Sequence, residues 1–144
     1  MPNQTKQVIV MRNDLGMRKG KMIAQGSHAS IAFLTRRATR SHMYKFKRHH
    51  PSTKHKPRIP AEVTFTHAEC DWLETSFAKI CVRVNSEEEL LEIEQKARDA
   101  GLEVHLITDS GKTEFNGVPT NTCLAIGPDY SDNIDPITGE LKLL

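Results

Sequence analysis

Hydrophobic residues along the chain gather in four short runs that are typical of β-strands. The first run, QVIVM at residues 7–11, is β-branched and almost entirely apolar, as expected of a strand that is buried on both faces of a sheet. Three further runs are KICVRV at residues 79–84, EVHLIT at 103–108 and NTCLAIG at 121–127. Together these runs predict a sheet of four strands.

Helical spacing of apolar positions predicts a first helix over residues 20–34. Met22, Gly26, Ala29 and Phe33 lie on one stripe of this helix. Small residues keep the stripe thin, so another backbone can approach it closely. This shape suits packing on a sheet or on a second subunit.

A second helix is predicted after the second strand. Ser86 and Glu89 form the S-x-x-E pattern of a capping box, and Gly101 is a typical helix stop. The resulting order is strand, helix, strand, helix, strand, strand. We therefore expect an α/β fold, with three αβα layers and a mixed, largely parallel four-stranded sheet.

Length and composition indicate one domain in a reducing compartment. A chain of 144 residues is large enough for a single hydrophobic core, so we expect one domain over residues 1–144. No stretch approaches the roughly 20 apolar residues of a membrane helix, and the N-terminus lacks the apolar region of a secretory signal. Cys70, Cys81 and Cys123 show no C-x-x-C spacing, which favours buried or half-buried thiols over a zinc site or disulfides. A cytoplasmic location follows as an expectation.

Charge is distributed very unevenly, although the formal net charge is only +2. Residues 1–61 contain 14 Lys and Arg and a single acid, whereas residues 62–144 contain 6 Lys and Arg and 17 acids. Such asymmetry favours a basic face that binds a polyanion. The alternative is that the two halves intermix in the fold and neutralise each other.

The basic residues are densest between the first predicted helix and the second predicted strand. Residues 36–58 contain nine Lys or Arg, four of the seven histidines and no acid. We expect a helical extension to about His50 and then a mobile loop, because Pro51, Pro57 and Pro60 break any helix there.

Two roles are open for this basic segment. It could be a solvated insert with no partner. It could instead be an arm for RNA phosphates, with Tyr44 and Phe46 available to stack on bases. A metal site is not expected, because His49 and His50 have no carboxylate or cysteine nearby to complete a ligand set.

The stretch GMRKGKMIAQGSHAS at residues 16–30 has some features of a nucleotide-binding P-loop but not its spacing. A P-loop reads G-x-x-x-x-G-K-[ST]. Here only three residues separate the first two glycines, and methionine follows the lysine. A second GKT at residues 111–113 has Leu106 in place of its first glycine. The nucleoside-triphosphatase interpretation therefore fails.

A strand, a basic loop and a helix start remain at this stretch, and the free amides of a helix start suit a phosphate or an oxyanion. The strand predicted at 103–108 ends in DSGKT, which supplies Asp109, Lys112 and Thr113. A carboxylate that activates water and an ammonium that stabilises negative charge would form a catalytic couple.

Each of these residues also has a purely structural interpretation. Asp109 before Ser-Gly could only cap a turn. Lys19 and Lys21 could be solvated, and Gln25 and His28 could be satisfied by backbone partners.

Several segments together resemble the type-2 peptidyl-tRNA hydrolases. VIVMRNDLGMRKGKMIAQGSHAS is similar to that family's VLVVRxDL strand followed by MGKGKxAAQxxHA, and ITDSGKTEF is similar to its DAGRTQ segment. TCLAIGP and NIDPITGELKLL resemble its C-terminal strand and closing GHLKL run. The resemblance covers residues 7–34 and 79–144 in the family's order. A basic insertion at about 36–76 has no counterpart in the family pattern, and Arg18 replaces a family glycine.

The resemblance implies a fold, an activity and a set of residues. It implies a mixed four-stranded sheet flanked by helices, usually in a homodimer. It implies hydrolysis of the ester that joins a peptide to the terminal ribose of tRNA, without a metal or other cofactor, as in ribosome rescue. Carried over by position, the catalytic candidates are Lys21, Asp109, Gln25, His28, Thr113 and Thr122.

Roles within that reaction follow from the side-chain chemistry. Asp109 is the expected base or water-positioning group, and Lys21 is the expected electrostatic stabiliser. The basic loop and the insertion would bind tRNA through Arg18, Lys19, Arg36, Arg37, Arg40, Lys45, Lys47, Arg48 and Lys112.

Two other functions compete with this carboxylic ester hydrolase. One is a catalytically silent RNA-binding or interaction module on the same fold, which would need only the basic surface. The other is a small-molecule esterase or amidase, which the absence of a G-x-S-x-G motif disfavours. The substrate could be peptidyl-tRNA or another N-acyl-aminoacyl-tRNA.

Overall fold

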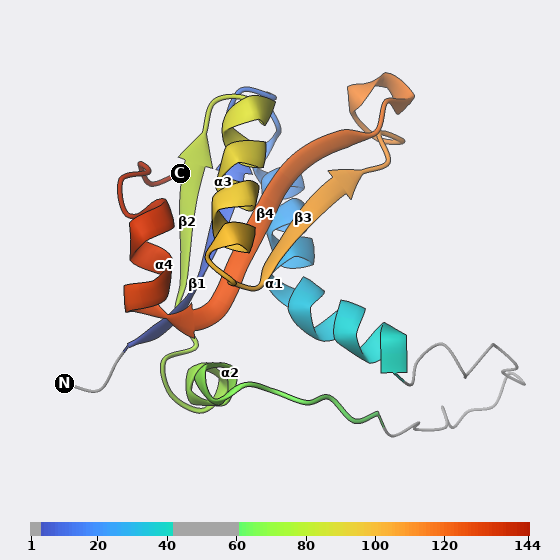
Figure 1. The fold of residues 1–144 in the computed structure, drawn as a ribbon. Helices are drawn as coiled ribbons and strands as arrows, with labels where there is room; N and C mark the ends of the chain where they lie inside the picture. The colour runs from blue at the N-terminus through green and yellow to red at the C-terminus, as the bar shows by residue number, and fades with distance from the viewer. Residues whose placement is uncertain (1–3, 42–60) are drawn as a thin grey trace, which may run out of the picture.

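A four-stranded sheet with the strand order β2-β1-β4-β3 lies at the centre of the molecule (Figure 1). The structure is a computed structural model that describes residues 4–41, with side chains to residue 38, and residues 61–144. Its strands are β1 (Thr5–Arg12), β2 (Lys79–Val84), β3 (Val104–Asp109) and β4 (Thr120–Tyr130). The four strands predicted from the sequence are thereby confirmed.

The sheet is mixed, as predicted, but the expected predominance of parallel pairing is wrong. Only β1 and β2 pair in parallel, and β4 pairs antiparallel with both β1 and β3. The strands β1, β2 and β3 therefore run in one direction, and β4 alone runs in the other. The reason is that β4 follows β3 after a short connection, without a crossover helix to return the chain.

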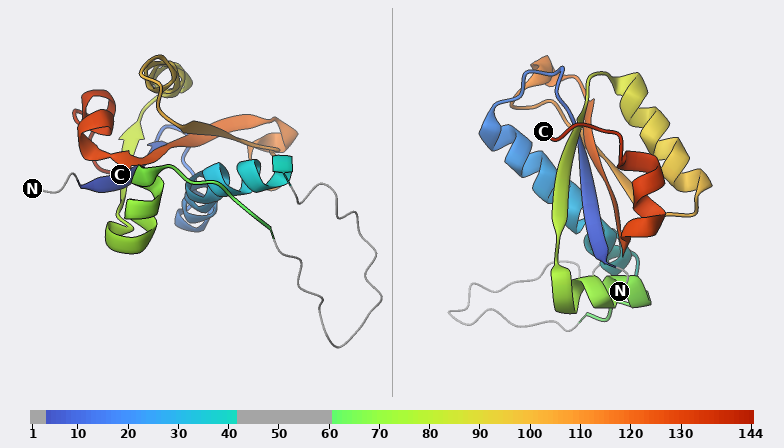
Figure 2. Two further views of the ribbon diagram at one scale, coloured as in Figure 1. Left: turned by 60° about the horizontal axis from the view of Figure 1, so that its bottom comes forward. Right: turned by 90° about the vertical axis from the view of Figure 1, so that its left-hand side faces the viewer.

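Helices cover both faces of the sheet, which confirms the three αβα layers (Figure 2). The long helix α1 (Lys19–Ser41) lies on one face, with α2 (His67–Asp71) and the π-helical turn η2 (Trp72–Ser76). The opposite face carries α3 (Glu87–Asp99) and α4 (Ser131–Thr138). None of the helices within the described ranges is long and apolar enough to cross a membrane.

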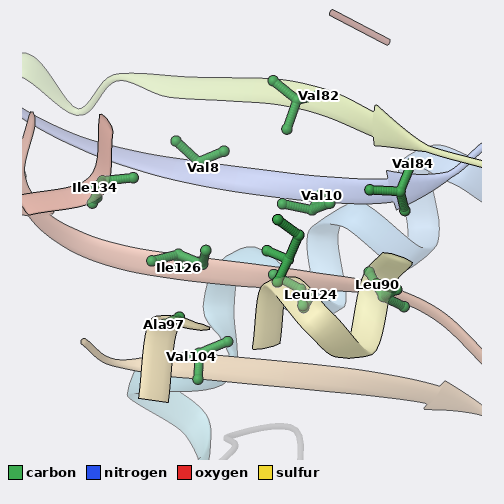
Figure 3. Packing of buried hydrophobic residues seen from close by; sticks show 11 residues of the cluster. Val8, Val10, Val82, Val84, Leu90, Ala97, Val104, Leu124, Ile126 and Ile134 are labelled. Atoms are coloured by element: carbon green, nitrogen blue, oxygen red, sulfur yellow. The ribbon is translucent and has the colours of Figure 1, made fainter. Parts of the chain in front are cut away.

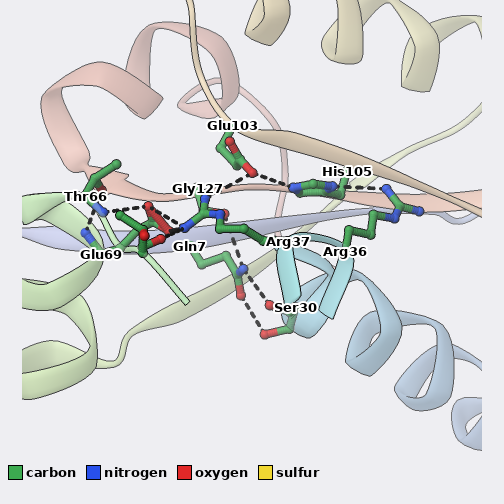
Figure 4. A network of polar contacts seen from close by, with 10 residues as sticks. Gln7, Ser30, Arg36, Arg37, Thr66, Glu69, Glu103, His105 and Gly127 are labelled. Carbon is green, nitrogen blue, oxygen red and sulfur yellow. Dashed lines mark hydrogen bonds and ion pairs between the residues drawn. The ribbon is translucent and has the colours of Figure 1, made fainter. Parts of the chain in front are cut away.

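Helix α1 packs closely on the sheet through its small residues. A Cβ atom at Gly26 would lie 3.7 Å from the terminal methyl of Met11, so only a small residue leaves this spacing undisturbed. The buried side chain of Gln7 also ties α1 to β1, because its amide donates to the Ser30 carbonyl at 2.9 Å and accepts from the Ser30 hydroxyl at 2.6 Å (Figure 4). The helix continues past residue 34 to Ser41, which confirms the first part of the predicted extension. The rest of that extension, to about His50, and the loop after it lie outside the described residues.

Helix α3 begins and ends where the sequence predicts. The Ser86 hydroxyl accepts a hydrogen bond from the Glu89 amide at 3.1 Å, while the Glu89 carboxylate accepts from the Asn85 amide at 2.8 Å rather than from Ser86. The chain leaves the helix at Gly101, whose φ of +73° is accessible to glycine at little cost.

Two hydrophobic clusters fill the spaces between the layers. The cluster under α3 and α4 is drawn in Figure 3 and contains Val8, Val10, Val82, Val84, Leu90, Ile93, Ala97, Val104, Leu124, Ile126 and Ile134. The cluster under α1 contains Ile9, Met11, Met17, Ala29, Ala32, Ile107, Cys123 and Ala125. Alternate residues of β1 contribute to the two clusters, which confirms that this strand is buried on both faces.

The cysteines differ in exposure. Cys123 is buried and Cys70 is partly buried, but Cys81 is exposed, so the expectation of burial is wrong for Cys81. The reason is that β2 is an edge strand of the sheet. Helix α1 does not cover this part of the sheet, and residues of β1 and β2 line a groove beside the helix.

Candidate active site

The start of α1 and the end of β3 meet at one edge of the sheet. There the Lys21 ammonium donates a hydrogen bond of 2.8 Å to Oδ1 of Asp109, although 88 positions separate the two residues in the chain. Both side chains are 13% exposed, so solvent reaches the pair while the protein covers most of it. The structure therefore brings together the two residues that the sequence singles out for catalysis.

The direction of the strands explains this meeting. Because β1 and β3 run the same way, the loop that leaves β1 and the residue that ends β3 lie at the same edge. The loop turns at Gly16, which has a φ of +64°, and is anchored by the buried side chain of Met17. Lys21 then lies in the first turn of α1.

Gln25, one turn further along α1, links Asp109 to β4. Its amide nitrogen donates to Oδ1 of Asp109 at 3.2 Å, and its amide oxygen accepts a hydrogen bond of 2.6 Å from the Thr122 hydroxyl. Gln25 and Thr122 are both buried. Since a buried amide with both ends bonded has little freedom to rotate, Gln25 fixes the position of the Asp109 carboxylate.

Thr113 completes the cluster on its exposed side. The Lys21 ammonium donates to the Thr113 hydroxyl at 3.2 Å and lies 5.9 Å from the centre of the Phe115 ring. We use the term active-site cluster for these candidate catalytic residues, which are Lys21, Gln25, Asp109, Thr113 and Thr122.

The turn after β3 supplies a further donor to Asp109. The Gly111 amide donates to Oδ2 at 2.9 Å, which is the local bond expected of an Asp that begins a turn. Gly111 has a φ of +80°, and a Cβ atom there would lie 2.4 Å from the Val118 carbonyl oxygen. A larger residue would therefore distort the turn. Asp109 thus caps the turn and also binds Lys21, so the structural interpretation is confirmed and the catalytic role stays a prediction.

These donors keep the Asp109 carboxylate ionised. The hydrogen bond from Lys21 is the largest cause that lowers the pKa of Asp109 below its usual value, and the Gly111 amide and Gln25 add to it. Asp109 is consequently a stable acceptor at neutral pH and a weak base.

Comparison with known proteins gives the family of this chain. A family model described as Peptidyl-tRNA hydrolase PTH2 matches residues 5–144. The chain belongs to this family. The resemblance that the sequence motifs indicate is thereby confirmed.

Relatives of this PTH2 chain occur in archaea and in an animal. A protein of Methanocaldococcus jannaschii named peptidyl-tRNA hydrolase is 44% identical over 140 residues, covering 96% of this chain and 99% of its own. A protein of the same name from Methanothermobacter thermautotrophicus is 40% identical over 139 residues, with coverage of 96% and 99%. A Drosophila melanogaster protein named probable peptidyl-tRNA hydrolase 2 is 36% identical over 139 residues, with coverage of 96% and 61%.

One solved structure shares the fold alone. It is a protein of unknown function from Agrobacterium tumefaciens, with a TM-score of 0.53, 10% identity, and coverage of 100% of this chain and 99% of its own.

The remaining predicted catalytic residue, His28, lies outside the active-site cluster of this PTH2 chain. Its side chain is exposed on α1 and has no hydrogen-bond partner within residues 4–41 and 61–144. Its catalytic role stays a prediction. Across the same described ranges, no group of three His, Cys, Asp or Glu side chains is arranged to hold a metal ion.

The basic residues predicted to bind tRNA fall into three sets. Arg18, Lys19 and Lys112 are exposed near the active-site cluster. Arg36 and Arg37, near the end of α1, make contacts within the protein. The side chain of Arg40 and the whole of Lys45, Lys47 and Arg48 lie outside the described residues.

The contacts of Arg36 and Arg37 join α1 to β3 and α2 (Figure 4). Arg36 donates to the Leu106 carbonyl at 2.8 Å and lies 3.1 Å from Nδ1 of His105. Arg37 pairs with Glu69 at 2.8 Å. Burial opposes the charged form of the guanidinium, but the pairing with Glu69 helps to raise its pKa above the usual value overall. These contacts compete with binding to phosphates, so a tRNA role for the two arginines stays a prediction.

A separate groove of about 610 Å³ lies on the α1 side of the sheet, between α1, η2 and β2. Its lining is largely apolar and includes Ile23, Ile31, Phe77, Cys81 and Leu144. None of the active-site cluster lines it. This groove was not predicted from the sequence, because the sequence pattern did not indicate η2, which forms one of its walls.

Proposed function

We propose that this chain hydrolyses the ester bond of peptidyl-tRNA and releases the peptide and free tRNA. The observation that carries this proposal is the 2.8 Å contact between Lys21 and Asp109 within the active-site cluster. Membership of the PTH2 family and the names of its relatives support the same activity. Nothing in the comparisons favours a silent binding module.

In this reaction Asp109 orients the attacking water. Its Oδ1 atom already accepts from Lys21 and Gln25, whereas Oδ2 accepts from the Gly111 amide and keeps a second lone pair for a water molecule. Its lowered pKa makes Asp109 better suited to hold the water than to remove a proton completely.

Lys21 stabilises the charge that forms when the water attacks. An ammonium has three N–H donors, of which one goes to Asp109 and one to Thr113. The third can bind the carbonyl oxygen of the ester as it becomes an oxyanion. The tetrahedral carbon then loses the ribose oxygen, which takes up the proton given up by the attacking water and becomes the tRNA hydroxyl, and the peptide leaves as a carboxylic acid.

The exposed charges near the cluster would bind the phosphates of the tRNA end. Arg18 and Lys19 precede or begin α1, and Lys112 lies on the turn after Asp109. We include the basic segment at residues 36–58 in this contact. Its dense positive charge suits a polyanionic partner such as tRNA, whereas a hydrolase of small esters would have no use for it. A tRNA substrate also implies a cytoplasmic location and a part in translation, such as ribosome rescue.

The apolar groove would be the contact between two copies of this chain. Ile23 is 69% exposed, Phe77 is 54% exposed and Ile31 is 49% exposed, and these side chains line one continuous depression. A patch of this kind on a folded protein marks an interaction site. A homodimer would cover these apolar side chains, and none of the active-site cluster lines the groove.

The direct test of the activity compares two substrates. The protein is incubated with peptidyl-tRNA and with a free ester of the same peptide, and peptide release is measured. Release from the tRNA alone supports the proposal. Equal release from both esters, or release from neither, would refute it.

A further inference from the structure

The pairing of β3 with β4 contains a bulge next to the active-site cluster. Ile107 pairs with Cys123, but the next residue, Thr108, pairs with Asn121. Thr122 therefore has no opposite residue and is the extra residue of β4.

The bulge decides which face of the sheet Thr122 occupies. Leu124 and Ile126 belong to the cluster under α3, and Cys123 to the cluster under α1. Because alternate residues of a strand share a face, regular alternation would place Thr122 on the same face as Leu124, under α3. Instead its hydroxyl bonds to Gln25 of α1, so Thr122 and Cys123 face the same side.

Side chains on the opposite face hold the bulge. The Thr108 hydroxyl donates to Oδ1 of Asn121 at 2.6 Å, which joins the two strands at the shifted pair. The amide nitrogen of Asn121 donates to Glu87 at the start of α3 at 2.9 Å. Both ends of the Asn121 amide are thus bonded, and its side chain points away from Lys21 and Asp109.

Arg12 holds the main chain at the same point. The last registered pair between β1 and β4 is Met11 with Cys123. Beyond it the guanidinium of Arg12 donates to the Asn121 carbonyl at 3.0 Å, and it is itself fixed by a two-point contact with Asp14 at 2.7 and 3.1 Å. Arg12 is almost fully buried, so this carbonyl has a rigid partner.

We infer that Asn121 is a positioning residue, which acts through the bulge to aim Thr122 at Gln25 and so to fix the Asp109 carboxylate. This inference rests on the proposed function, since it assigns Asn121 a role in the same ester hydrolysis. Thr108 of β3 and Arg12 of β1 support Asn121 in this role. Loss of the Asn121 amide allows the bulge to relax toward regular pairing, which turns Thr122 away from α1.

The kinetic test uses Asn121→Ala and Thr108→Val, with Thr108→Ser as the conservative variant that keeps the hydroxyl. We expect the first two to lower kcat for peptidyl-tRNA about tenfold or more, because small displacements of catalytic groups are costly, with KM within about twofold. Thr108→Ser and the matched control Asn133→Ala, which removes an exposed amide on α4, should keep the wild-type kcat. Wild-type kcat in both Asn121→Ala and Thr108→Val would overturn the inference.

A second readout does not depend on activity. The side-chain amide signals of Gln25, identified by their loss in Gln25→Glu, are compared by NMR among the same variants. We expect Asn121→Ala to shift them in the direction seen for Thr122→Val, and Asn133→Ala to leave them unmoved. Gln25 signals that stay unmoved in Asn121→Ala would overturn the inference even if the wild-type enzyme is active. If the wild type fails to hydrolyse peptidyl-tRNA but the signals shift as expected, the proposed function is wrong and the inference about the bulge stands.

Discussion

Lys21 and Asp109 form a hydrogen-bonded ion pair across 88 positions of the chain, and each reaches the other from the end of a different element. Lys21 lies in the first turn of a helix and Asp109 ends a strand. The pair sits at the sheet edge where β1 and β3 both finish, with Gln25 bound to the same carboxylate oxygen. A positive and a negative group are thereby held together at one site, as the proposed ester hydrolysis requires.

Asp109→Asn should reduce kcat for peptidyl-tRNA by about a hundredfold or more, because an amide cannot accept from Lys21, Gly111 and a water as a carboxylate does. The variant should still fold, since the amide is close in shape to the carboxylate. Single-turnover kinetics and circular dichroism measure the two effects. Activity near the wild-type level would show that the carboxylate is not needed.

The pH dependence of stability should report the lowered pKa of Asp109. A carboxyl whose pKa is lower in the folded state stabilises the fold above its unfolded pKa, which is about 3.9 for Asp. This contribution is lost as the pH falls through the lower, folded value. The difference in the free energy of unfolding between wild type and Asp109→Asn should therefore be constant near pH 7 and shrink below about pH 4. Urea unfolding at a series of pH values measures it, and a difference that does not change with pH would contradict the assignment.

Neutralising the basic segment should weaken tRNA binding and reduce its dependence on salt. Lys45, Lys47 and Arg48 are replaced together by Gln, and Kd for tRNA is measured from about 50 to 200 mM salt. If these residues bind phosphates, the slope of log Kd against log salt should fall by about one for each phosphate that the variant no longer neutralises, while kcat stays the same. A triple variant with Glu92, Glu94 and Asp99 replaced by neutral residues serves as a control on the acidic helix α3. An unchanged slope in the basic-segment variant would leave that segment without a role in binding.

A charge in the apolar groove should separate the proposed homodimer. Ile23→Glu places a carboxylate on its most exposed wall and should yield a monomer of 16.3 kDa in light scattering, whereas the wild type should have twice that mass. Leu91→Glu, on the exposed side of α3, is the matched control. A monomeric wild type would contradict the proposed contact.

Much of the fold was predictable because local patterns determine it. The four strands, the Ser86 cap and the Gly101 stop follow from alternation and capping chemistry, and the motifs around Lys21 and Asp109 indicate the family. The convergence of these two residues was predictable as well, since each follows a strand that runs in the same direction.

Other features depend on contacts between segments that are distant in the sequence. The reversed direction of β4 and the exposure of Cys81 depend on which strands become neighbours and which lie at an edge. Alternation predicts the wrong face for Thr122, because the bulge is set by side chains on β3, β1 and α3. Helices α2 and α4 are only five and eight residues long, and α4 contains Pro136, so neither was predicted from the sequence.

The most direct measurement of the central claim is single-turnover hydrolysis of peptidyl-tRNA by Lys21→Ala, with Lys19→Ala as its exposed neighbour and control. Loss of the ammonium should lower the rate by about a hundredfold to a thousandfold, as for other removed oxyanion donors, in a variant that circular dichroism shows to be folded. Lys19→Ala should weaken binding and leave the rate at saturation unchanged. A Lys21→Ala variant that hydrolyses peptidyl-tRNA at the wild-type rate would contradict the account.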